Sequence, residues 1–361
     1  MRHSKQLLHI AIDIQYTASS LRHRDQLHNL TFSPRHKQSD DKFRAQVHNL
    51  EYIPQSKPRE QAGRFFGMRD VYDYGVMDEF QVLFDHSEDS ALMDPAASRY
   101  GKLGFPPPPP DRPWIYANFV QTLDGIVSLL GDDASGADIA GLAEDRWLMD
   151  LLRAHADAVM LGMGTLREEQ KMGRPRARGP VFRIVDAGMQ QLRTRLQHSR
   201  ERNILVTARA DFQLADYAVF DGAHVDVTVL TTREGAERLE AQRKSHGWVD
   251  IIAVDASLTG GGVDMRQAVA ALKQRYGINY LLCEGGPSLY SGMIMAELID
   301  EKFLTVSPVE VGRMSAQGLR PSVLPEVGLS KEDAVRWSWL SCRKVGDHQF
   351  HRFRRKVSGI C

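Results

Sequence analysis

Short apolar runs alternate with helix-like segments from residue 114 onward, and this alternation limits the folds open to the protein. The expected strands share an almost continuous apolar character and cover residues 114–120, 157–162, 203–207, 225–230, 250–254 and 279–284. The expected helices follow them at 144–155, 182–197, 236–245, 265–276 and 289–299. Strands without polar alternation are typical of a parallel sheet that is covered on both faces. The order therefore predicts an α/β protein with a mostly parallel sheet and helices on both faces.

The C-terminal segment has a different pattern. Residues 301–309 and 337–354 alternate apolar with polar side chains, and the second stretch is divided by Gly346-Asp347, a common hairpin turn. These features predict antiparallel strands added at one edge of the sheet.

Two of the expected strands end in glycine-rich turns that lead directly into helices. The strand at 279–284 continues into Glu284-Gly285-Gly286-Pro287-Ser288, and the strand at 157–162 continues into Gly162-Met163-Gly164-Thr165. Glycine lets the backbone approach a phosphate closely, and the start of a helix attracts negative charge. One such turn alone is often a plain connection. Two of them at carboxyl ends of parallel strands predict one phosphate-binding crevice.

Composition narrows the class of partner. The protein has 361 residues, 42% hydrophobic and 25% charged, which is enough for a full α/β core. Its 46 basic and 46 acidic residues balance, so there is no general attraction to nucleic acid or anionic lipid. The three cysteines, Cys283, Cys342 and Cys361, are too few for a disulfide framework or a Cys-x-x-Cys zinc site. We therefore expect a cytoplasmic protein that binds a small molecule, with no metal, nucleic acid or membrane partner.

Residues 1–76 differ from the rest and are expected to be a disordered extension. The first 60 residues hold six of the 13 histidines and ten Lys or Arg against six Asp or Glu, without sustained periodicity. The stretch is also compatible with a translated upstream segment, in which case Met68 or Met77 is the natural start, and intact-mass analysis of the native protein would decide. A nucleic-acid role for this basic stretch requires salt-dependent affinity that is lost when residues before Met77 are removed.

Residues 77–113 are expected to be a linker. They contain one short apolar element, FQVLF at 80–84, and five consecutive prolines at 106–110. A proline run forms a stiff extended spacer that cannot join the interior of a sheet. The folded domain is therefore expected to cover residues 114–361.

Four sequence blocks carry a family resemblance. They are ANFVQTLDG (117–125), LRAHADAVMLGMGT (152–165), NILVTARAD (203–211) and LLCEGGPSLYSGMIMAELIDEKFLTVSP (281–308). Together they resemble the reductase domain at the C-terminus of the riboflavin biosynthesis protein RibD, in its stand-alone form, because the motifs of the zinc deaminase half are absent. The resemblance implies a dihydrofolate-reductase-like fold, NADPH as cofactor, a homodimer, and reduction of the ribosyl group of a phosphorylated aminopyrimidine to ribityl.

The resemblance assigns the cofactor to the two glycine turns and to one arginine. The positions that match the family pattern in the turns are Gly162, Gly164, Thr165, Glu169, Gly285, Gly286, Pro287, Ser288 and Leu289. Arg209, just past the strand at 203–207, is the candidate ligand of the NADPH 2′-phosphate, because a guanidinium matches phosphate geometry. Thr207 stands beside it. Each also has a structural interpretation: Arg209 as an ordinary surface arginine, and Thr207 as a residue that simply favours a strand.

The substrate side of the crevice depends on two carboxylates. Asp124 and Glu284 are the catalytic candidates, because the reduction needs a proton and hydrogen bonds that hold the sugar hydroxyls. Each has a structural alternative: Asp124 as a turn residue before Gly125, and Glu284 as an acid that stabilises the glycine turn. Thr122 and Asn118 are expected to orient the substrate.

The substrate half also departs from the family pattern. Ile126 stands where members usually have Lys, and a different sequence replaces their Asp-Asp-Pro-x-Leu-Thr stretch after the first glycine turn. Arg174, Arg176 and Arg178 are candidate replacements for the substrate-phosphate ligands. Two other functions therefore stay open: a dihydrofolate reductase that acts on a pterin, and a non-catalytic relative that binds NADPH without turnover.

Overall fold

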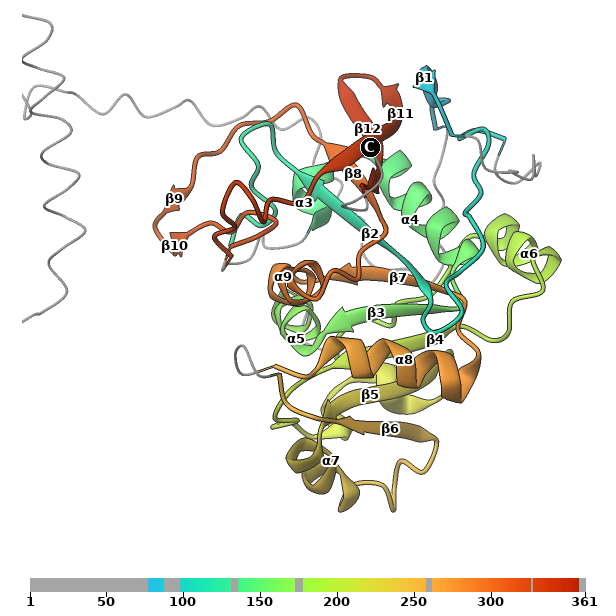
Figure 1. The fold of residues 1–361 in the computed structure, drawn as a ribbon, viewed down its shortest axis with the longest axis vertical. Helices are drawn as coiled ribbons and strands as arrows, with labels where there is room; N and C mark the ends of the chain where they lie inside the picture. Colours follow the sequence, from blue (N-terminus) through green and yellow to red (C-terminus); the bar gives the residue numbers. More distant parts are fainter. Residues whose placement is uncertain are drawn as a thin grey trace, which may run out of the picture. The chain divides into compact units, whose positions relative to one another are not determined.

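The computed structural model describes residues 77–87, 98–130, 136–172, 178–257, 262–325 and 327–356, all within the compact unit Phe66–Cys361. Within them, ten strands form one sheet in the order β1-β11-β12-β8-β2-β7-β3-β4-β5-β6 (Figure 1). Their bounds are β1 (Gln81–Asp85), β2 (Trp114–Gln121), β3 (Ala158–Gly162), β4 (Arg202–Val206), β5 (Asp226–Thr232), β6 (Val249–Val254), β7 (Tyr280–Gly285), β8 (Glu301–Val306), β11 (Trp337–Val345) and β12 (His348–Arg355). A separate two-stranded ribbon joins β9 (Met314–Ser315) to β10 (Gly318–Leu319).

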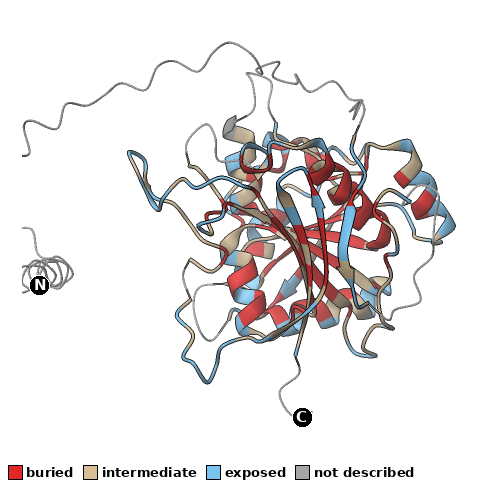
Figure 2. Ribbon diagram, turned by 90° about the horizontal axis from the view of Figure 1, so that it is seen from above, coloured by how far each residue is buried: buried red, intermediate tan, exposed pale blue. Residues whose placement is uncertain are grey.

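Helices cover both faces of the sheet, as predicted. One hydrophobic cluster packs α4 (Ala143–His155), α5 (Met163–Met172), α6 (Ala187–Arg195) and α7 (Arg233–Glu240) on the first face. A second cluster packs α8 (Met265–Tyr276) and α9 (Pro287–Met295) on the other. Figure 2 shows the buried residues on the strands and on the inward sides of the helices. Among the described residues, no helix is both long and apolar enough to cross a bilayer.

Seven neighbouring strands, from β8 to β6, run parallel, which confirms the predicted parallel sheet. β3 shows why the sequence predicted this part well, because four of its five residues are buried. A strand buried on both faces needs an unbroken apolar run, and such runs are visible in the sequence. Short elements complete this part of the molecule: α3 (Gly136–Ala140) and the 3-10 turns η4 (Leu214–Asp216) and η5 (Ala218–Asp221).

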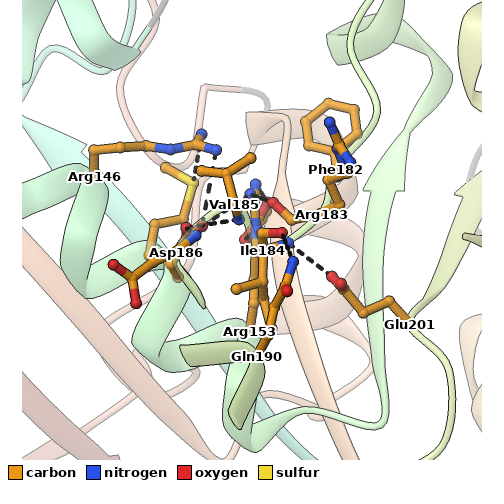
Figure 3. A network of polar contacts seen from close by, with 12 residues as sticks. Arg146, Arg153, Phe182, Arg183, Ile184, Val185, Asp186, Gln190 and Glu201 are labelled. Atoms are coloured by element: carbon orange, nitrogen blue, oxygen red, sulfur yellow. Dashed lines mark hydrogen bonds and ion pairs between the residues drawn. The ribbon is translucent and has the colours of Figure 1, made fainter. Parts of the chain in front are cut away.

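The helix predicted at 182–197 is shorter in the structure, where only α6 is helical. Residues 182–185 are held in a non-helical path by distant partners, since Ile184 N–H donates to Glu201 and Val185 N–H donates to Asp150 (Figure 3). Asp186 then caps α6 by accepting from Met189 N–H. The helix predicted at 236–245 instead spans Arg233–Glu240, and the one predicted at 289–299 spans Pro287–Met295.

The C-terminal strands correct one prediction. β11 and β12 form the expected antiparallel hairpin, and β12 pairs antiparallel with β8. However, β8 runs parallel to β2, so the segment predicted at 301–309 belongs to the parallel part of the sheet. The edge position is taken by β1, which pairs antiparallel with β11.

The described residues between 77 and 113 belong to the folded unit and are not a linker. Besides the strand β1, they place Phe80, Tyr100 and Leu103 in the same hydrophobic cluster as α4. Phe105 stacks on Tyr116 of β2 with 4.3 Å between ring centroids. The prolines therefore form only a short connection into β2, and the fold begins upstream of residue 114. The extension predicted at 1–76 lies outside the described residues.

Asp157 joins two strands at the amino end of the sheet. Its Oδ2 accepts the backbone N–H groups of Asn279 and Tyr280 at 2.7 and 2.9 Å, and its Oδ1 lies 2.7 Å from Nδ1 of His198. Burial acts to raise the pKa of Asp157, but the hydrogen bonds from His198 and the two amides outweigh it, so this pKa lies below its ordinary value. Such a carboxylate stabilises the fold at pH values above the pKa that it has in the unfolded protein. The stabilisation is lost as pH falls through the pKa that it has in the folded protein.

We expect Asp157→Asn to lower the free energy of unfolding by about 1–2 kcal/mol at neutral pH, because one hydrogen-bonded charge is lost. The difference from the parent protein should begin to shrink as pH falls below about 4, where the carboxyl group of the unfolded chain takes up a proton, and should vanish below the lowered pKa of the folded protein. Urea denaturation of both proteins between pH 3 and pH 7 measures this. A difference that stays constant over that range would show that the charge of Asp157 does not contribute.

Candidate functional site

The two glycine turns lie side by side at the carboxyl ends of β3 and β7, as predicted. These strands are parallel neighbours, with Leu161 opposite Gly285. The helix α5 leaves β3 toward one face of the sheet, and α9 leaves β7 toward the other (Figure 1). In open α/β sheets, ligands bind outside the carboxyl ends of two strands whose following helices separate in this way. The space outside these two turns, called the crevice below, is therefore the candidate ligand site.

Gly285 and Gly286 occupy positions without room for a side chain. A Cβ on Gly285 would lie 3.0 Å from Cα and Cβ of Leu161, and one on Gly286 would lie 2.7 Å from Oγ1 of Thr165. Gly286 also has φ +55° and ψ 141°, which only glycine adopts readily. The β7 turn thus packs directly on the β3 turn. Gly164, by contrast, is exposed with open space around it, so its bare backbone faces solvent.

Two helix N-termini meet at this crevice. Met163 already belongs to the first turn of α5, and α9 begins at Pro287 with Gly286 as its N-cap. Neither helix has an acidic residue in its first turn, and Gly286 has no side chain to cap the amides. First-turn amides lack partners within their own helix, and the helix dipoles add positive potential, which suits an anion. The structure thus gathers the predicted residues Gly162, Gly164, Thr165, Gly285, Gly286, Pro287, Ser288 and Leu289.

Arg209 lies at the same sheet edge, just after β4, the neighbour of β3. Thr207 shapes this turn, because its N–H donates to the carbonyl of Leu230 and its hydroxyl accepts from Ala210 N–H. The guanidinium of Arg209 is exposed and forms no hydrogen bond or ion pair with the described residues. It is therefore available to an anionic ligand.

Glu284 is held by Arg153 of α4, a residue that sequence reasoning missed. Nε and Nη2 of Arg153 donate to Oε1 and Oε2 of Glu284, each at 2.6 Å, and the two side chains are 2% and 6% exposed. Burial acts to lower the pKa of Arg153, but Glu284 raises it above its ordinary value. Both carboxylate oxygens are thus engaged by α4, a structural role that differs from the predicted stabilisation of the glycine turn, and the catalytic role of Glu284 stays a prediction. The sequence did hold a signal for this partner, because Arg153 directly follows the apolar residues Leu151 and Leu152 in the helix predicted at 144–155.

Asp124 fixes one loop to another. Its Oδ1 accepts from Oγ1 of Thr122 at 2.5 Å, and its Oδ2 accepts from Gly312 N–H at 2.7 Å. The hydrogen bond from Thr122 is the largest cause of its lowered pKa, which keeps this exposed carboxylate ionised near neutral pH. This geometry agrees with the turn-residue alternative, and the catalytic role of Asp124 stays a prediction.

Asn118 of β2 is a neighbour of Glu284 on the same face of the sheet. The last aligned pair of β2 and β7 is Ala117 and Cys283, after which the two strands separate. The Oδ1 atom of Asn118 is buried and accepts no hydrogen bond from the described part of the protein. A buried acceptor without a donor is costly unless a ligand supplies one.

The remaining substrate candidates are less well placed. Ile126 is fully buried, so the position where the resemblance expects Lys is part of the core. Arg178 forms two hydrogen bonds with the carboxylate of Asp221, at 2.8 and 2.9 Å, and is committed there. Arg174 and Arg176 lie outside the described residues. Within the described ranges, no three His, Cys, Asp or Glu side chains gather into a group that holds a metal.

A family model described as the RibD C-terminal domain matches residues 113–348. The protein is 26% identical over 204 residues to the 2,5-diamino-6-ribosylamino-4(3H)-pyrimidinone 5′-phosphate reductase of Archaeoglobus fulgidus, a match that spans 56% of the present sequence and 83% of that relative. Its fold is similar to that of a pyrimidine reductase-like protein from Corynebacterium diphtheriae (TM-score 0.51, 19% identity, 69% of the present sequence and 94% of the other). It is also similar to RibD of Acinetobacter baumannii (TM-score 0.50, 15% identity, 69% of the present sequence), of which it spans 59%. These structural matches confirm the predicted fold.

Proposed function

This protein belongs to the RibD C-terminal domain family, and from that premise we propose that it is an NADPH-dependent reductase that converts the ribosyl group of a phosphorylated aminopyrimidine to ribityl. The observation that carries the proposal is the contact between the two glycine turns. The helices α5 and α9 begin at these turns and then leave toward opposite faces of the sheet. A dinucleotide has a diphosphate that matches such a site.

The residues present fit the cofactor. The first turns of α5 and α9 would hold the diphosphate, because Gly285 and Gly286 keep side chains out of the space between the strands. Arg209 would bind the 2′-phosphate, since its exposed guanidinium lies at the same sheet edge. When bound, NADPH supplies a hydride. The protein's own residues bind it, orient the substrate and provide a proton.

The substrate class follows from the family and from the name of the Archaeoglobus relative. Asp124, which is ionised, and Asn118, which has an unsatisfied acceptor, are suited to accept hydrogen bonds from sugar hydroxyls. Arg174 and Arg176 remain candidates for the substrate phosphate. The replacement of Lys by buried Ile126 means that the phosphate ligands here differ from the family pattern.

The proposal is tested by following the loss of NADPH absorbance with three compounds side by side: the phosphorylated ribosyl diaminopyrimidinone, its aminouracil equivalent and dihydrofolate. Turnover with either of the first two supports the proposal. Turnover with dihydrofolate alone identifies a pterin reductase instead. NADPH binding without turnover on any of the three identifies a non-catalytic relative.

Arg209→Ala is expected to weaken NADPH binding by about 1–3 kcal/mol, because a charged hydrogen-bond donor to the 2′-phosphate is lost. NADH binding should not change, since NADH lacks that phosphate. Arg243→Ala is a matched control, because Arg243 is a similarly exposed arginine whose guanidinium pairs with Glu240 on the surface. Fluorescence titration with both cofactors measures the effect. Equal weakening of NADPH and NADH would assign Arg209 a structural role.

We also propose that the protein is a cytoplasmic homodimer. Cys283 and Cys342 are free thiols, as expected in a reducing compartment. One face of the antiparallel strands carries an aromatic row in which Trp339 contacts the rings of Phe84 and Phe353 while remaining 49% exposed. Exposed aromatic rings are enriched at protein interfaces. A monomer mass in sedimentation equilibrium would exclude the dimer, and cell fractionation tests the location.

A further inference from the structure

The start of α7 packs against the turn after β4, which carries Arg209. The carbonyl of Ala208 accepts hydrogen bonds from the hydroxyls of Thr231 and Thr232, at 3.2 and 2.7 Å. Thr232 is also the N-cap of α7, because its hydroxyl accepts from Gly235 N–H at 3.1 Å. One threonine side chain therefore joins the first turn of α7 to the backbone next to Arg209.

Gly235 lets α7 approach this turn closely. A Cβ on Gly235 would lie 2.0 Å from Oγ1 of Thr231 and 2.9 Å from the carbonyl oxygen of Ala208. Gly235 is buried and its backbone is helical, so its conformation does not require glycine. Glycine is unfavourable within a helix relative to alanine, and the close approach accounts for its presence here.

A second contact from α7 reaches Arg209 itself. Nη1 of Arg238 donates to the carbonyl of Arg209 at 2.7 Å, and Nη2 of Arg238 pairs with Glu234. The side chain of Arg238 is 42% exposed, so it is not part of the core. Because the peptide group is planar, a held carbonyl fixes the peptide plane that follows Arg209. It thereby fixes the direction in which the Arg209 side chain leaves the backbone.

The residue after Arg209 has an unusual backbone conformation. Ala210 is buried and has φ +49°, in the left-handed region that favours glycine. Its N–H donates to Oγ1 of Thr207 at 3.2 Å. Such a conformation is strained for alanine and persists only where the surrounding structure holds it, which is common at ligand sites.

The same turn is tied to α5, the helix that begins at the first glycine turn. Asp211 accepts from Nη2 of Arg167 in α5, with 2.7 Å between the two atoms. The helix α5 also carries Thr165 and the half-buried Glu169, both predicted cofactor positions. The turn that carries Arg209 is therefore held between α5 on the crevice side and α7 on the other.

On the basis of the proposed function, in which Arg209 binds the 2′-phosphate, we propose that α7 determines the preference for NADPH over NADH, with Gly235 and Arg238 as positioning residues. Neither residue has to contact the cofactor. A guanidinium binds a phosphate best through two parallel hydrogen bonds, which require a defined direction of approach. A turn that α7 already holds loses less conformational freedom on binding than a free turn does. The gain applies only to NADPH, since NADH offers Arg209 no phosphate.

The test measures the Kd values of NADPH and NADH by fluorescence titration for Arg238→Ala, Arg209→Ala and the double variant. We expect Arg238→Ala to weaken NADPH binding about five- to tenfold, the effect of one hydrogen bond, and NADH binding by less than about twofold. In the Arg209→Ala background, Arg238→Ala should add less than about twofold, because a positioning residue acts only through the residue that it positions. An equal effect in both backgrounds would make Arg238 a direct partner of the phosphate and overturn its positioning role. Arg243→Ala, which removes the same charge just after α7, should leave both Kd values unchanged.

Gly235→Ala tests the packing of α7 against the turn. The added Cβ would displace the carbonyl of Ala208, so NADPH binding should weaken about fivefold or more while the Kd for NADH stays within about twofold. Gly247→Ala is the matched control, since Gly247 is exposed and its added Cβ would lie at an ordinary contact distance of 3.8 Å from the carbonyl oxygen of Arg243. Thermal unfolding shows whether Gly235→Ala is folded at the temperature of the titration. If it is unfolded, the double variant of Arg238 and Arg209 decides alone.

These binding measurements do not need turnover, so they separate the role of α7 from the proposed reaction. A wild type that prefers NADPH but reduces none of the three test compounds would refute the reductase, and the variants would still decide the role of α7. A wild type that reduces a test compound, with a preference for NADPH that survives in Arg238→Ala and in folded Gly235→Ala, would overturn the role of α7 alone. A wild type that binds NADPH and NADH equally would overturn both this role and the assignment of Arg209 to the 2′-phosphate.

Discussion

Arg153→Met should lower the free energy of unfolding by about 3–5 kcal/mol, because removing one member of a buried ion pair leaves the other charged and unpaired. Arg153 and Glu284 are joined by two hydrogen bonds of 2.6 Å and are almost fully buried. The change also removes a donor from the carbonyl of Arg183. The pair connects α4 to β7 across 131 positions of sequence, so its loss should loosen the turn that borders the crevice.

Urea denaturation of a matched set of variants measures this effect. Arg153→Lys keeps the charge but not the two-pronged geometry, so an intermediate loss is expected. Arg243→Met removes an exposed arginine from a surface pair with Glu240 and should cost at most about 1 kcal/mol. The double variant Arg153→Met/Glu284→Leu should recover much of the loss, since neither charge remains buried. A loss below about 1 kcal/mol for Arg153→Met alone would show that the ion pair does not contribute to stability.

The parts of the fold that follow from local pattern could be predicted from the sequence. β3 is apolar on both faces, and β7 is apolar up to Glu284; a parallel sheet accounts for such runs. The contact of the two glycine turns also followed, because both close parallel strands at the same edge of the sheet. The hairpin of β11 and β12 had its own turn signal at Gly346-Asp347.

The features that depend on distant partners could not be predicted in this way. The segment before α6 has a helical pattern but is held extended by Asp150 and Glu201. β1 has little burial of its own and gains its place from pairing with β11, more than 250 positions further along the sequence. In the site, Glu284 was identified but its partner Arg153 was not. An ion pair is set by two side chains that meet only in the folded state, whereas a glycine turn is encoded by adjacent residues.

The same contrast explains why the cofactor side of the site is better defined than the substrate side. The proposed cofactor side consists of backbone amides at two helix starts, whose positions are fixed by the strands themselves. The proposed substrate side consists mainly of side chains from β2 and the loop after it, and several of them have structural partners. Asp124 holds the loop at 309–312, and Ile126 is buried where the family pattern has a lysine. Substrate identity therefore rests on family membership and on the turnover experiment.

Gly286→Ala is expected to weaken NADPH binding at least tenfold. The added Cβ would lie 2.7 Å from Oγ1 of Thr165, and the backbone angles of Gly286 carry a strain of about 1–3 kcal/mol for any other residue. Relief requires the turn to move, which displaces the amides of the first turn of α9 from the diphosphate. Because a tenfold change in Kd corresponds to about 1.4 kcal/mol, a strain of this size is sufficient.

Gly292→Ala is the matched control for this prediction, because Gly292 lies on the same helix, is exposed, and has no atom within 4 Å of an added Cβ. Alanine favours a helix interior over glycine, so this variant should bind NADPH normally and be slightly more stable. Fluorescence titration gives the two Kd values, and thermal unfolding shows whether Gly286→Ala remains folded at the temperature of the titration. A folded Gly286→Ala protein with unchanged affinity would remove the β7 turn from the cofactor site, since the diphosphate could not then depend on the position of that backbone.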